Sequence, residues 1–149
     1  MESVKSKTLQ RAGWREWVGL PQLGIPRIKA KLDSGARTSC LHAFETEEVE
    51  RDGVRWLRFK VHPHQNDLDT VVVCEAPLLE QRKVTDSGGH VEWRPVIQTE
   101  LVMAGQRWPI EMTVTNRDTM KFRMLIGRTA MKGRLLIDSD ASFLLNLEP

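Results

Sequence analysis

The residue with the clearest chemical potential in this chain is Asp33, which opens the segment Asp33-Ser34-Gly35-Ala36. The preceding residues, Ile28 to Leu32, alternate apolar and polar side chains as a half-buried strand does. Gly35 permits a tight turn directly after that strand, and the Ser34 hydroxyl can fix neighbouring main chain. The pattern predicts a carboxylate held at a strand end. Because Asp, Ser and Gly are common in turns, the segment alone also fits a structural turn.

Metal binding is a second chemistry that the side chains allow. Four places carry histidine or cysteine donors: Cys40-Leu41-His42, His62-Pro63-His64, Cys74 and His90. Such donors can form a tetrahedral zinc site. However, the chain has no His-Glu-x-x-His segment and no Cys-x-x-Cys pair. We therefore expect no metal and no other cofactor, and we keep a zinc-dependent peptidase as an alternative.

Nucleophilic catalysis would need a serine activated by a base. Ser34 and Ser39 lie close to His42 in sequence, but the chain has no Gly-x-Ser-x-Gly segment, and proximity in sequence does not make a triad. A Gly-x-x-x-x-Gly-Lys-Ser/Thr loop is also absent, so we predict no use of nucleotides.

The composition narrows the class of protein. The 149 residues carry a formal net charge of +2, with arginine and lysine scattered singly, so we expect no direct binding of nucleic acid. Nothing approaches the roughly 18 consecutive apolar residues of a membrane span, and the first residues do not resemble a secretory signal. With only two cysteines, a disulfide framework is not expected, which favours the cytoplasm.

The elements that must position these residues are predicted to be strands, because the dominant hydrophobic period is two. Turns are predicted at Arg51-Asp52-Gly53 and at Ala104-Gly105-Gln106, where the second joins a hairpin. Thr129 to Gly133 is predicted to form one helical turn closed by glycine, and Glu45 to Glu50 is a weaker helix candidate. The predicted strands are Ile28 to Leu32, Trp56 to Val61, Thr70 to Cys74, Val91 to Trp93, Val96 to Met103, Trp108 to Thr115, Arg123 to Ile126, Leu135 to Ile137 and Phe143 to Leu145.

Many short strands separated by turns predict an all-β barrel or sandwich. We expect one domain over residues 1–149, in which 1–20 are an N-terminal extension or a dimer-contact segment. A chain of this length fits a single domain.

Two further segments follow the Asp33 turn, and the order of the three segments can be compared with that of known families. A glycine-rich hairpin, Val84 to Val91, comes first, and Leu125-Ile126-Gly127-Arg128 then leads into the predicted helical turn. This order resembles that of retropepsins over roughly Ile25 to Leu145. The segments Asp33 to Ala43 and Asn116 to Arg128 are more closely similar to a bacterial group of retropepsin-like peptidases, the RimB-like group, which has long been labelled "ATP-dependent zinc protease".

The resemblance implies a closed barrel with one short C-terminal helix, and an aspartic peptidase mechanism. Such enzymes need two carboxylates that share a proton. This chain has one Asp-Ser-Gly-Ala segment, so the resemblance implies a homodimer in which Asp33 from each protomer meets at the two-fold axis. It assigns support of the catalytic turn to Ser34, Gly35, Ala36 and Thr38, and the flap to Thr85, Asp86, Ser87, Gly88 and Gly89. The stretch Phe44 to Lys83 is longer than in viral enzymes, which leaves the shape of the cleft open.

Some members of this group act beside the glutamate ligase RimK, and one trims glutamates from a small-subunit ribosomal protein. By resemblance, the expected substrate is an acidic peptide or a polyglutamate tail, with a functional link to a glutamate ligase. The planar guanidinium of arginine can form two parallel hydrogen bonds with a carboxylate. The candidate substrate contacts are therefore Arg37, Arg117 and Arg128. A non-catalytic module that only captures acidic peptides remains an alternative, because a fold does not establish activity.

Overall fold

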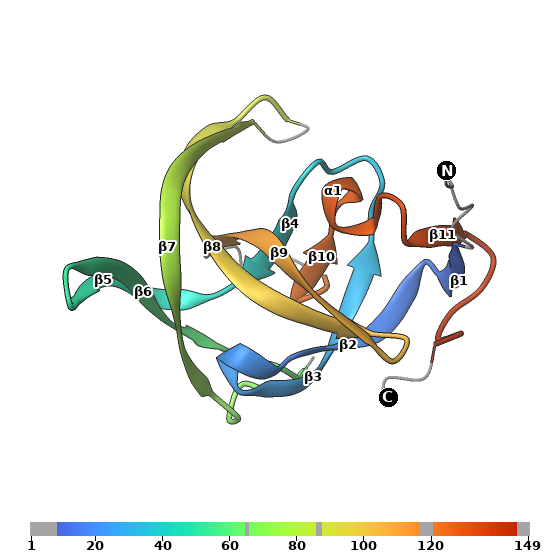
Figure 1. Cartoon of the computed structure of the whole chain (residues 1–149), viewed down its shortest axis with the longest axis horizontal. Helices are drawn as coiled ribbons and strands as arrows, with labels where there is room; N and C mark the ends of the chain where they lie inside the picture. Colours follow the sequence, from blue (N-terminus) through green and yellow to red (C-terminus); the bar gives the residue numbers. More distant parts are fainter. Residues whose placement is uncertain (1–8, 65, 86–87, 117–120, 146–149) are drawn as a thin grey trace, which may run out of the picture.

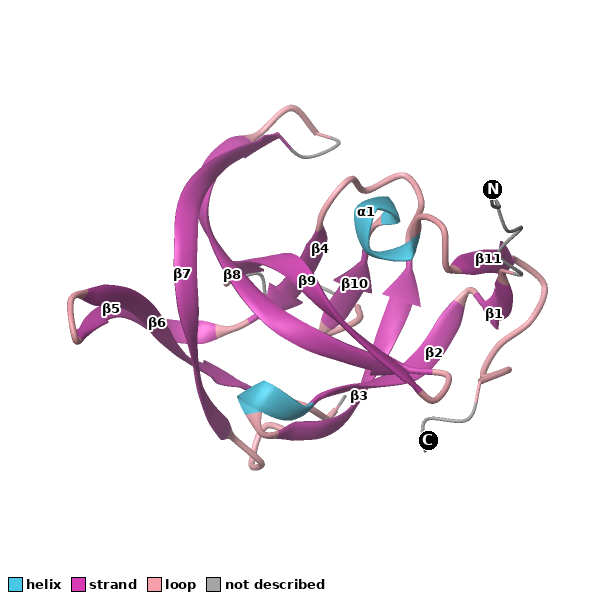
Figure 2. Cartoon of the chain, viewed as in Figure 1, coloured by secondary structure: helices cyan, strands magenta, loops and turns pink. Residues whose placement is uncertain are grey.

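The computed structural model describes residues 9–64, 66–85, 88–116 and 121–145. Figure 2 shows that strands dominate, with one short α-helix and one 3-10 turn. The elements are β1 (Gln10–Gly13), β2 (Arg15–Leu20), η1 (Pro21–Leu23), β3 (Ile25–Leu32), β4 (Ser39–His42), β5 (Phe44–Arg51), β6 (Val54–Val61), β7 (Val72–Thr85), β8 (Val91–Met103), β9 (Gln106–Thr115), β10 (Met124–Ile126), α1 (Arg128–Met131) and β11 (Leu135–Asp138).

The main sheet closes on itself. Its strand order is β2-β3-β10-β4-β9-β8-β7-β6-β5, and an additional pairing of β2 with β8, at Gly19 and Val102, joins six of these strands into a ring. Strands β7, β6 and β5 extend from the ring, and β1 and β11 form a separate parallel pair (Figure 1). The predicted all-β closed barrel with one short C-terminal helix is confirmed.

Alternation along the strands explains the core. On β3, Ile28, Ala30 and Leu32 are buried, whereas the intervening Lys29 and Lys31 are partly exposed. The same two-residue period recurs on β6 and β9, and buried side chains from these strands fill one continuous apolar cluster. Burial of the alternate face is what fixes the register of each strand. The predicted hairpin at Ala104 and Gly105 is confirmed, since β8 and β9 pair up to Met103 and Gln106.

The weaker helix prediction for Glu45 to Glu50 was wrong. These residues lie in β5, which pairs with β6 in antiparallel register. Glutamate has a high intrinsic helix propensity. In this segment, however, ion pairs with the neighbouring strand stabilise the extended conformation. Glu48 pairs with Arg55, and the Glu45 carboxylate lies 2.7 Å from Lys60 Nζ. Cross-strand contacts therefore override the local preference.

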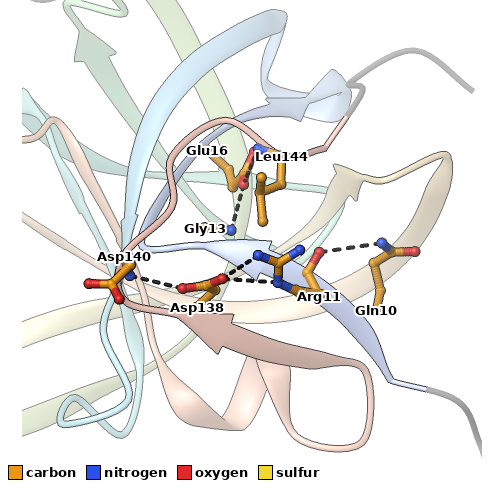
Figure 3. Close-up of polar contacts among 7 residues, drawn as sticks. All are labelled: Gln10, Arg11, Gly13, Glu16, Asp138, Asp140 and Leu144. Carbon is orange, nitrogen blue, oxygen red and sulfur yellow. Dashed lines mark hydrogen bonds and ion pairs between the residues drawn. The ribbon is translucent and has the colours of Figure 1, made fainter.

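The strand predicted at Phe143 to Leu145 was also wrong, because this segment packs along β2 without joining a sheet. The fully buried Glu16 carboxylate accepts hydrogen bonds from the backbone N–H groups of Leu144 and Leu145, at 2.8 and 3.1 Å. It also accepts one from the Gly13 N–H, at 2.7 Å. Figure 3 shows Glu16 between Gly13 and Leu144. A side chain, rather than a strand ladder, thus anchors the C-terminal segment.

Part of the segment expected as an N-terminal extension is built into the fold. Residues 10–13 form β1, which pairs with β11 and is tied to it by an ion pair between Arg11 and Asp138 (Figure 3). Residues 15–20 form β2, a member of the closed ring, and its Val18 and Leu20 are fully buried. Within the described ranges there is no helix with the length and apolar character that a membrane crossing requires.

Candidate active site

Asp33 lies where β3 and β4, which are close in sequence, meet the distant strand β10. It follows the last residue of β3, and β10 lies between β3 and β4, parallel to the first and antiparallel to the second. The Asp33 N–H donates a hydrogen bond to the Ile126 carbonyl oxygen on β10, at 2.8 Å. The backbone of Asp33 is therefore held by the sheet although its side chain lies at a strand end.

The turn after Asp33 orients the carboxylate. The Gly35 N–H donates to Asp33 Oδ1 at 2.9 Å, and the Ala36 N–H donates to the Asp33 carbonyl oxygen at 3.2 Å. Asp33 is half-buried, whereas Ser34 and Gly35 are exposed. Since Oδ1 accepts the Gly35 N–H, the other carboxylate oxygen is left for a further partner.

The first residues of α1 donate hydrogen bonds to the backbone of the same turn. The Arg128 N–H donates to the Ala36 carbonyl oxygen at 2.8 Å, and Thr129 Oγ1 donates to that of Arg37 at 2.8 Å. The Arg128 guanidinium lies 3.4 Å from the Ser34 carbonyl oxygen and 3.5 Å from that of Gly35. Arg128, predicted as a substrate contact, thus also contacts the backbone of the turn.

Ser39 is a supporting residue that the sequence did not reveal in this role. It is fully buried, and its Oγ accepts a hydrogen bond from the Gly127 N–H at 3.0 Å. Ser39 and His42 are three positions apart on β4, so their side chains point to opposite faces of the sheet. This arrangement does not suit a nucleophilic serine and its base. No local sequence signal identifies this role, because Ser39 meets Gly127 only through the pairing of β4 with β10.

Gly127 approaches the turn after Asp33 too closely for a side chain. A Cβ at this position would lie 2.7 Å from the Thr38 carbonyl carbon and 2.9 Å from the Ala36 carbonyl oxygen. Backbone atoms cannot yield as a flexible side chain can, so Gly127→Ala is expected to lower the free energy of unfolding by about 1–3 kcal/mol. Urea unfolding of the purified variant measures this.

Gly53 provides the comparison for this substitution. A Cβ added at the exposed Gly53 would meet no atom within 4 Å, but the backbone there has a φ of +79°. Gly53→Ala therefore reports the cost of a left-handed backbone alone, without a steric clash. Equal stability of Gly127→Ala and the wild type would contradict the close approach described here.

The predicted flap corresponds to the far end of the β7–β8 hairpin. These strands pair up to Thr85 and Val91, and Thr85, Gly88 and Gly89 are exposed. Asp86 and Ser87, also predicted in the flap, lie outside the described residues, as does Arg117. In Figure 1 the end of this hairpin and the loop between β3 and β4 lie on the same, upper side of the molecule.

A cavity of about 380 Å³ lies between the hairpin and the turn after Asp33. Its walls come from the turn, from the stem of β7 and from the central strands. Four of its lining residues are cations, and none of its described lining residues is acidic. The lining residues are Gly35, Ala36, Arg37, Thr38, Cys40, Arg82, Lys83, Val84, Thr85, Arg94, Thr113 and Leu125. Of these lining residues, the sequence predicted Gly35, Ala36, Arg37, Thr38 and Thr85 at the site, whereas Arg82, Lys83 and Arg94 were missed.

Two neighbouring cavities continue this surface around α1. One, of about 510 Å³, is lined by Arg37, Thr38 and Arg82 among others, and one of about 660 Å³ is lined by Ser34, Arg37 and Arg128 among others. Arg37 is thus shared by all three cavities. Of the two predicted substrate contacts that the structure describes, Arg37 lines all three cavities and Arg128 lines one.

Several cations on the Asp33 side of the molecule differ from those on β5 and β6, although Arg82 and Arg94 are paired with glutamates. On β5 and β6, Arg51, Arg55, Arg58 and Lys60 each form an ion pair with a glutamate. By contrast, Arg37, Lys83, Arg128 and Lys132 form no ion pair with a carboxylate in the described part of the chain. Uncompensated cations raise the local potential and attract anionic ligands.

The histidine and cysteine donors do not gather. No three His, Cys, Asp or Glu side chains within residues 9–64, 66–85, 88–116 and 121–145 are placed to hold a metal ion. The His62 ring stacks on Phe44, with 4.5 Å between ring centroids, and Cys74 is buried on β7. The described residues therefore offer no ligand set for the zinc alternative.

Burial raises the pKa of the Cys74 thiol to about 12. A thiol is a nucleophile only as the thiolate, so Cys74 is expected to resist alkylation by iodoacetamide at a pH of about 8 in the folded protein and to react once urea unfolds it. Site-resolved mass spectrometry measures this. Rapid labelling of Cys74 in the native protein would contradict the burial described here.

Comparisons with known proteins agree with this arrangement. Residues 11–146 match the family model described as RimB-like, retropepsin-like aspartic endopeptidase RimB. The chain is 53% identical over 130 residues to a probable alpha-L-glutamate ligase of Parasynechococcus marenigrum, covering 87% of this chain and 28% of that protein. It is 49% identical over 126 residues to a protein of the same name from Desulfotalea psychrophila, covering 85% and 27%. The chain therefore spans just over a quarter of the length of these relatives.

A solved structure resembles the whole fold. It is that of a Legionella pneumophila protein of unknown function, with a TM-score of 0.75 and 25% sequence identity, covering 92% of this chain and 98% of that one. The family match includes β2 to β11, all but the first residue of β1, and both segments that form the Asp33 turn. The chain therefore belongs to the RimB-like family of retropepsin-like aspartic endopeptidases.

Proposed function

We propose that this protein is a homodimeric aspartic endopeptidase in which Asp33 from each of two protomers forms the catalytic pair. The observation that carries the proposal is the Asp33 carboxylate itself. It stands at the end of β3, oriented by the Gly35 N–H at 2.9 Å, beside a cavity bounded by the β7–β8 hairpin. Membership of a retropepsin-like endopeptidase family supports the same reaction.

The reaction needs two carboxylates because one must be ionised while the other is protonated. Two like charges a few Å apart do not both ionise readily, so such a pair holds one proton between them. The ionised member takes a proton from a water molecule, whose oxygen attacks the peptide carbonyl carbon, while the protonated member donates to the carbonyl oxygen. Collapse of the tetrahedral intermediate breaks the C–N bond, and the departing nitrogen takes up a proton.

In this proposal the other predicted residues have supporting roles. Gly35 and Ala36 keep the turn tight, Ser34 braces the pair of turns across the two-fold axis, and Thr38 lines the cleft. The hairpin from Thr85 to Gly89 closes over the substrate and excludes water. Because these 149 residues hold one Asp-Ser-Gly-Ala segment, the proposed mechanism takes the second carboxylate from another protomer, and activity follows association.

The proposed substrate is an acidic peptide, such as a polyglutamate tail on a ribosomal protein. Uncompensated cations near Asp33 support this preference, and Arg37 and Arg128 are the described candidates for gripping carboxylates. The relatives named glutamate ligase, which share this segment within a longer chain, support a functional link to such a ligase. A ribosomal substrate and two cysteines that form no disulfide both favour the cytoplasm.

The test combines hydrolysis with oligomeric state. The purified protein is incubated with a polyglutamylated peptide and with an unrelated peptide library, and the products are read by mass spectrometry. Sedimentation across a range of protein concentrations follows the dimer. We expect cleavage of the acidic peptide with a rate that rises with the dimer fraction. Binding of the acidic peptide without any hydrolysis would instead favour the non-catalytic module, and a strictly monomeric protein would remove the paired-carboxylate mechanism.

A further inference from the structure

The cavity of about 380 Å³ between the catalytic turn and the stem of the β7–β8 hairpin has an unusual pair of residues at its wall. Arg82 on β7 and Arg94 on β8 are direct cross-strand partners. Directly opposed residues on neighbouring strands point to the same face, and like charges in such positions destabilise a sheet. An anionic ligand that lies between the two guanidinium groups would relieve this repulsion.

The protein itself neutralises the two arginines unequally. Arg82 forms ion pairs with Glu80 and, at 3.0 Å, with Glu111. Arg94 has one carboxylate contact, from Nη2 to Glu92 at 3.2 Å, and the other oxygen of that carboxylate accepts a hydrogen bond from Thr115 at 3.1 Å. Arg94 therefore shares its counter-ion with another donor.

Arg94 is also the most deeply buried of the cations in this cavity. It is only 7% exposed, its Nη1 lies 3.6 Å from Cys40 Sγ, and its Nε has no hydrogen-bond partner in the described part of the chain. A buried guanidinium with an unsatisfied donor and a weak thiol acceptor is costly unless a ligand completes its hydrogen bonds. The planar fork of arginine is suited to a carboxylate, which can accept two parallel hydrogen bonds.

We propose that this cavity, with Arg94 in its wall and Arg37 and Lys83 at its mouth, binds the carboxylate side chain of the peptide substrate, and that Arg94 is the residue that determines acidic specificity. The inference rests on the proposed function, because it places the substrate at the Asp33 cleft. Lys83 and Arg37 are exposed and draw the anion in, and the buried Arg94 selects it by direct contact.

Symmetry extends this inference to the sequence that is cut. A homodimer carries the same cavity twice, once on each side of the two-fold axis that passes between the Asp33 groups. An extended peptide crossing that axis meets one cavity on each side of the bond to be broken. The cleaved bond is therefore flanked by acidic residues on both sides, which makes a run of glutamates a substrate at internal positions and not only at its end.

The test uses four peptides of equal length that carry Glu on both sides of one bond, on either side alone, or Gln on both sides. Their kcat/KM values are measured for the wild-type dimer, and their affinities are measured by calorimetry on Asp33→Asn, which does not consume them. Each replacement of Glu by Gln is expected to lower kcat/KM and affinity by about 10-fold or more, as for the loss of a hydrogen bond to a charged group.

Arg94→Met is expected to reduce the preference for Glu over Gln by about 10- to 100-fold while cleavage of the Gln peptide persists. Arg55→Met is the matched control, because Arg55 is exposed, pairs with Glu48 and does not line the cavity. If Arg94→Met does not fold, the exposed pair Arg37→Met and Lys83→Met takes its place, with an expected reduction of about 3- to 10-fold in the same ratio.

The outcomes separate this inference from the proposed function. Cleavage of all four peptides at similar rates, with the ratio unchanged in the variants, overturns the acidic cavity and leaves the peptidase intact. Absence of any cleavage, together with Glu-selective binding that depends on Arg94, removes the peptidase and supports the cavity. Equal affinity for the Glu and Gln peptides overturns the cavity regardless of activity.

Discussion

Replacing Asp33 with asparagine is expected to lower kcat/KM for peptide cleavage by at least about 10³-fold, because the proposed dimer then has no carboxylate at its active site to exchange a proton with the attacking water. The folded state should change little. The Asp33 carboxylate accepts one hydrogen bond in the described chain, from the Gly35 N–H at 2.9 Å, and the asparagine amide oxygen can accept the same bond. Initial rates and thermal unfolding of the purified variant measure both effects.

Asp69→Asn is the matched control for this substitution, since Asp69 is an exposed turn residue that does not line the cavity. A mixing experiment adds a sharper test of the shared pair. Excess Asp33→Asn protein should suppress wild-type activity beyond simple dilution, because mixed dimers contain only one carboxylate. Activity of Asp33→Asn close to that of the wild type would exclude the aspartic mechanism.

Glu16→Leu is expected to lower the free energy of unfolding by about 2–4 kcal/mol, because it removes a buried acceptor from the backbone N–H groups of Gly13, Leu144 and Leu145. Leucine has a similar volume but accepts no hydrogen bonds, and the Gly13 N–H remains buried. Urea denaturation followed by tryptophan fluorescence measures the loss.

The control for this second substitution is Glu50→Leu, at an exposed position on β5, for which we expect a change within about 0.5 kcal/mol. Glu16→Gln keeps one acceptor oxygen and should lie between the two. A loss below about 1 kcal/mol for Glu16→Leu would mean that water replaces the carboxylate at all three N–H groups.

The sequence predicted the strands and turns of the barrel well, because the signals for them lie within each short segment of the chain. Alternation of apolar and polar residues identifies β3 and β6, and glycine identifies the turns after Leu32 and Met103. The Asp33 turn could be placed for the same reason, since the strand before it and the glycine within it are adjacent in the chain.

Features that depend on pairing between distant segments could not be read in this way. Arg82 and Arg94 become neighbours only through the register of the β7–β8 hairpin, and nothing in either local sequence indicates that register. Ser39 acquires its role from Gly127, which reaches it from the opposite end of the chain. Glu16 lies on the same face of β2 as the buried Val18 and Leu20, and only the returning C-terminal segment shows why a carboxylate is buried there.

The position of β10 between β3 and β4 has a consequence for biosynthesis. Its three residues are made long after both neighbours, and the Asp33 N–H has no β10 carbonyl to bind until Ile126 has left the ribosome. Long-range pairing of this kind forms late in folding. The Asp33 turn is therefore completed only after Ile126 has been made, so the activity proposed for this turn has to wait for a segment about 90 residues further along the chain.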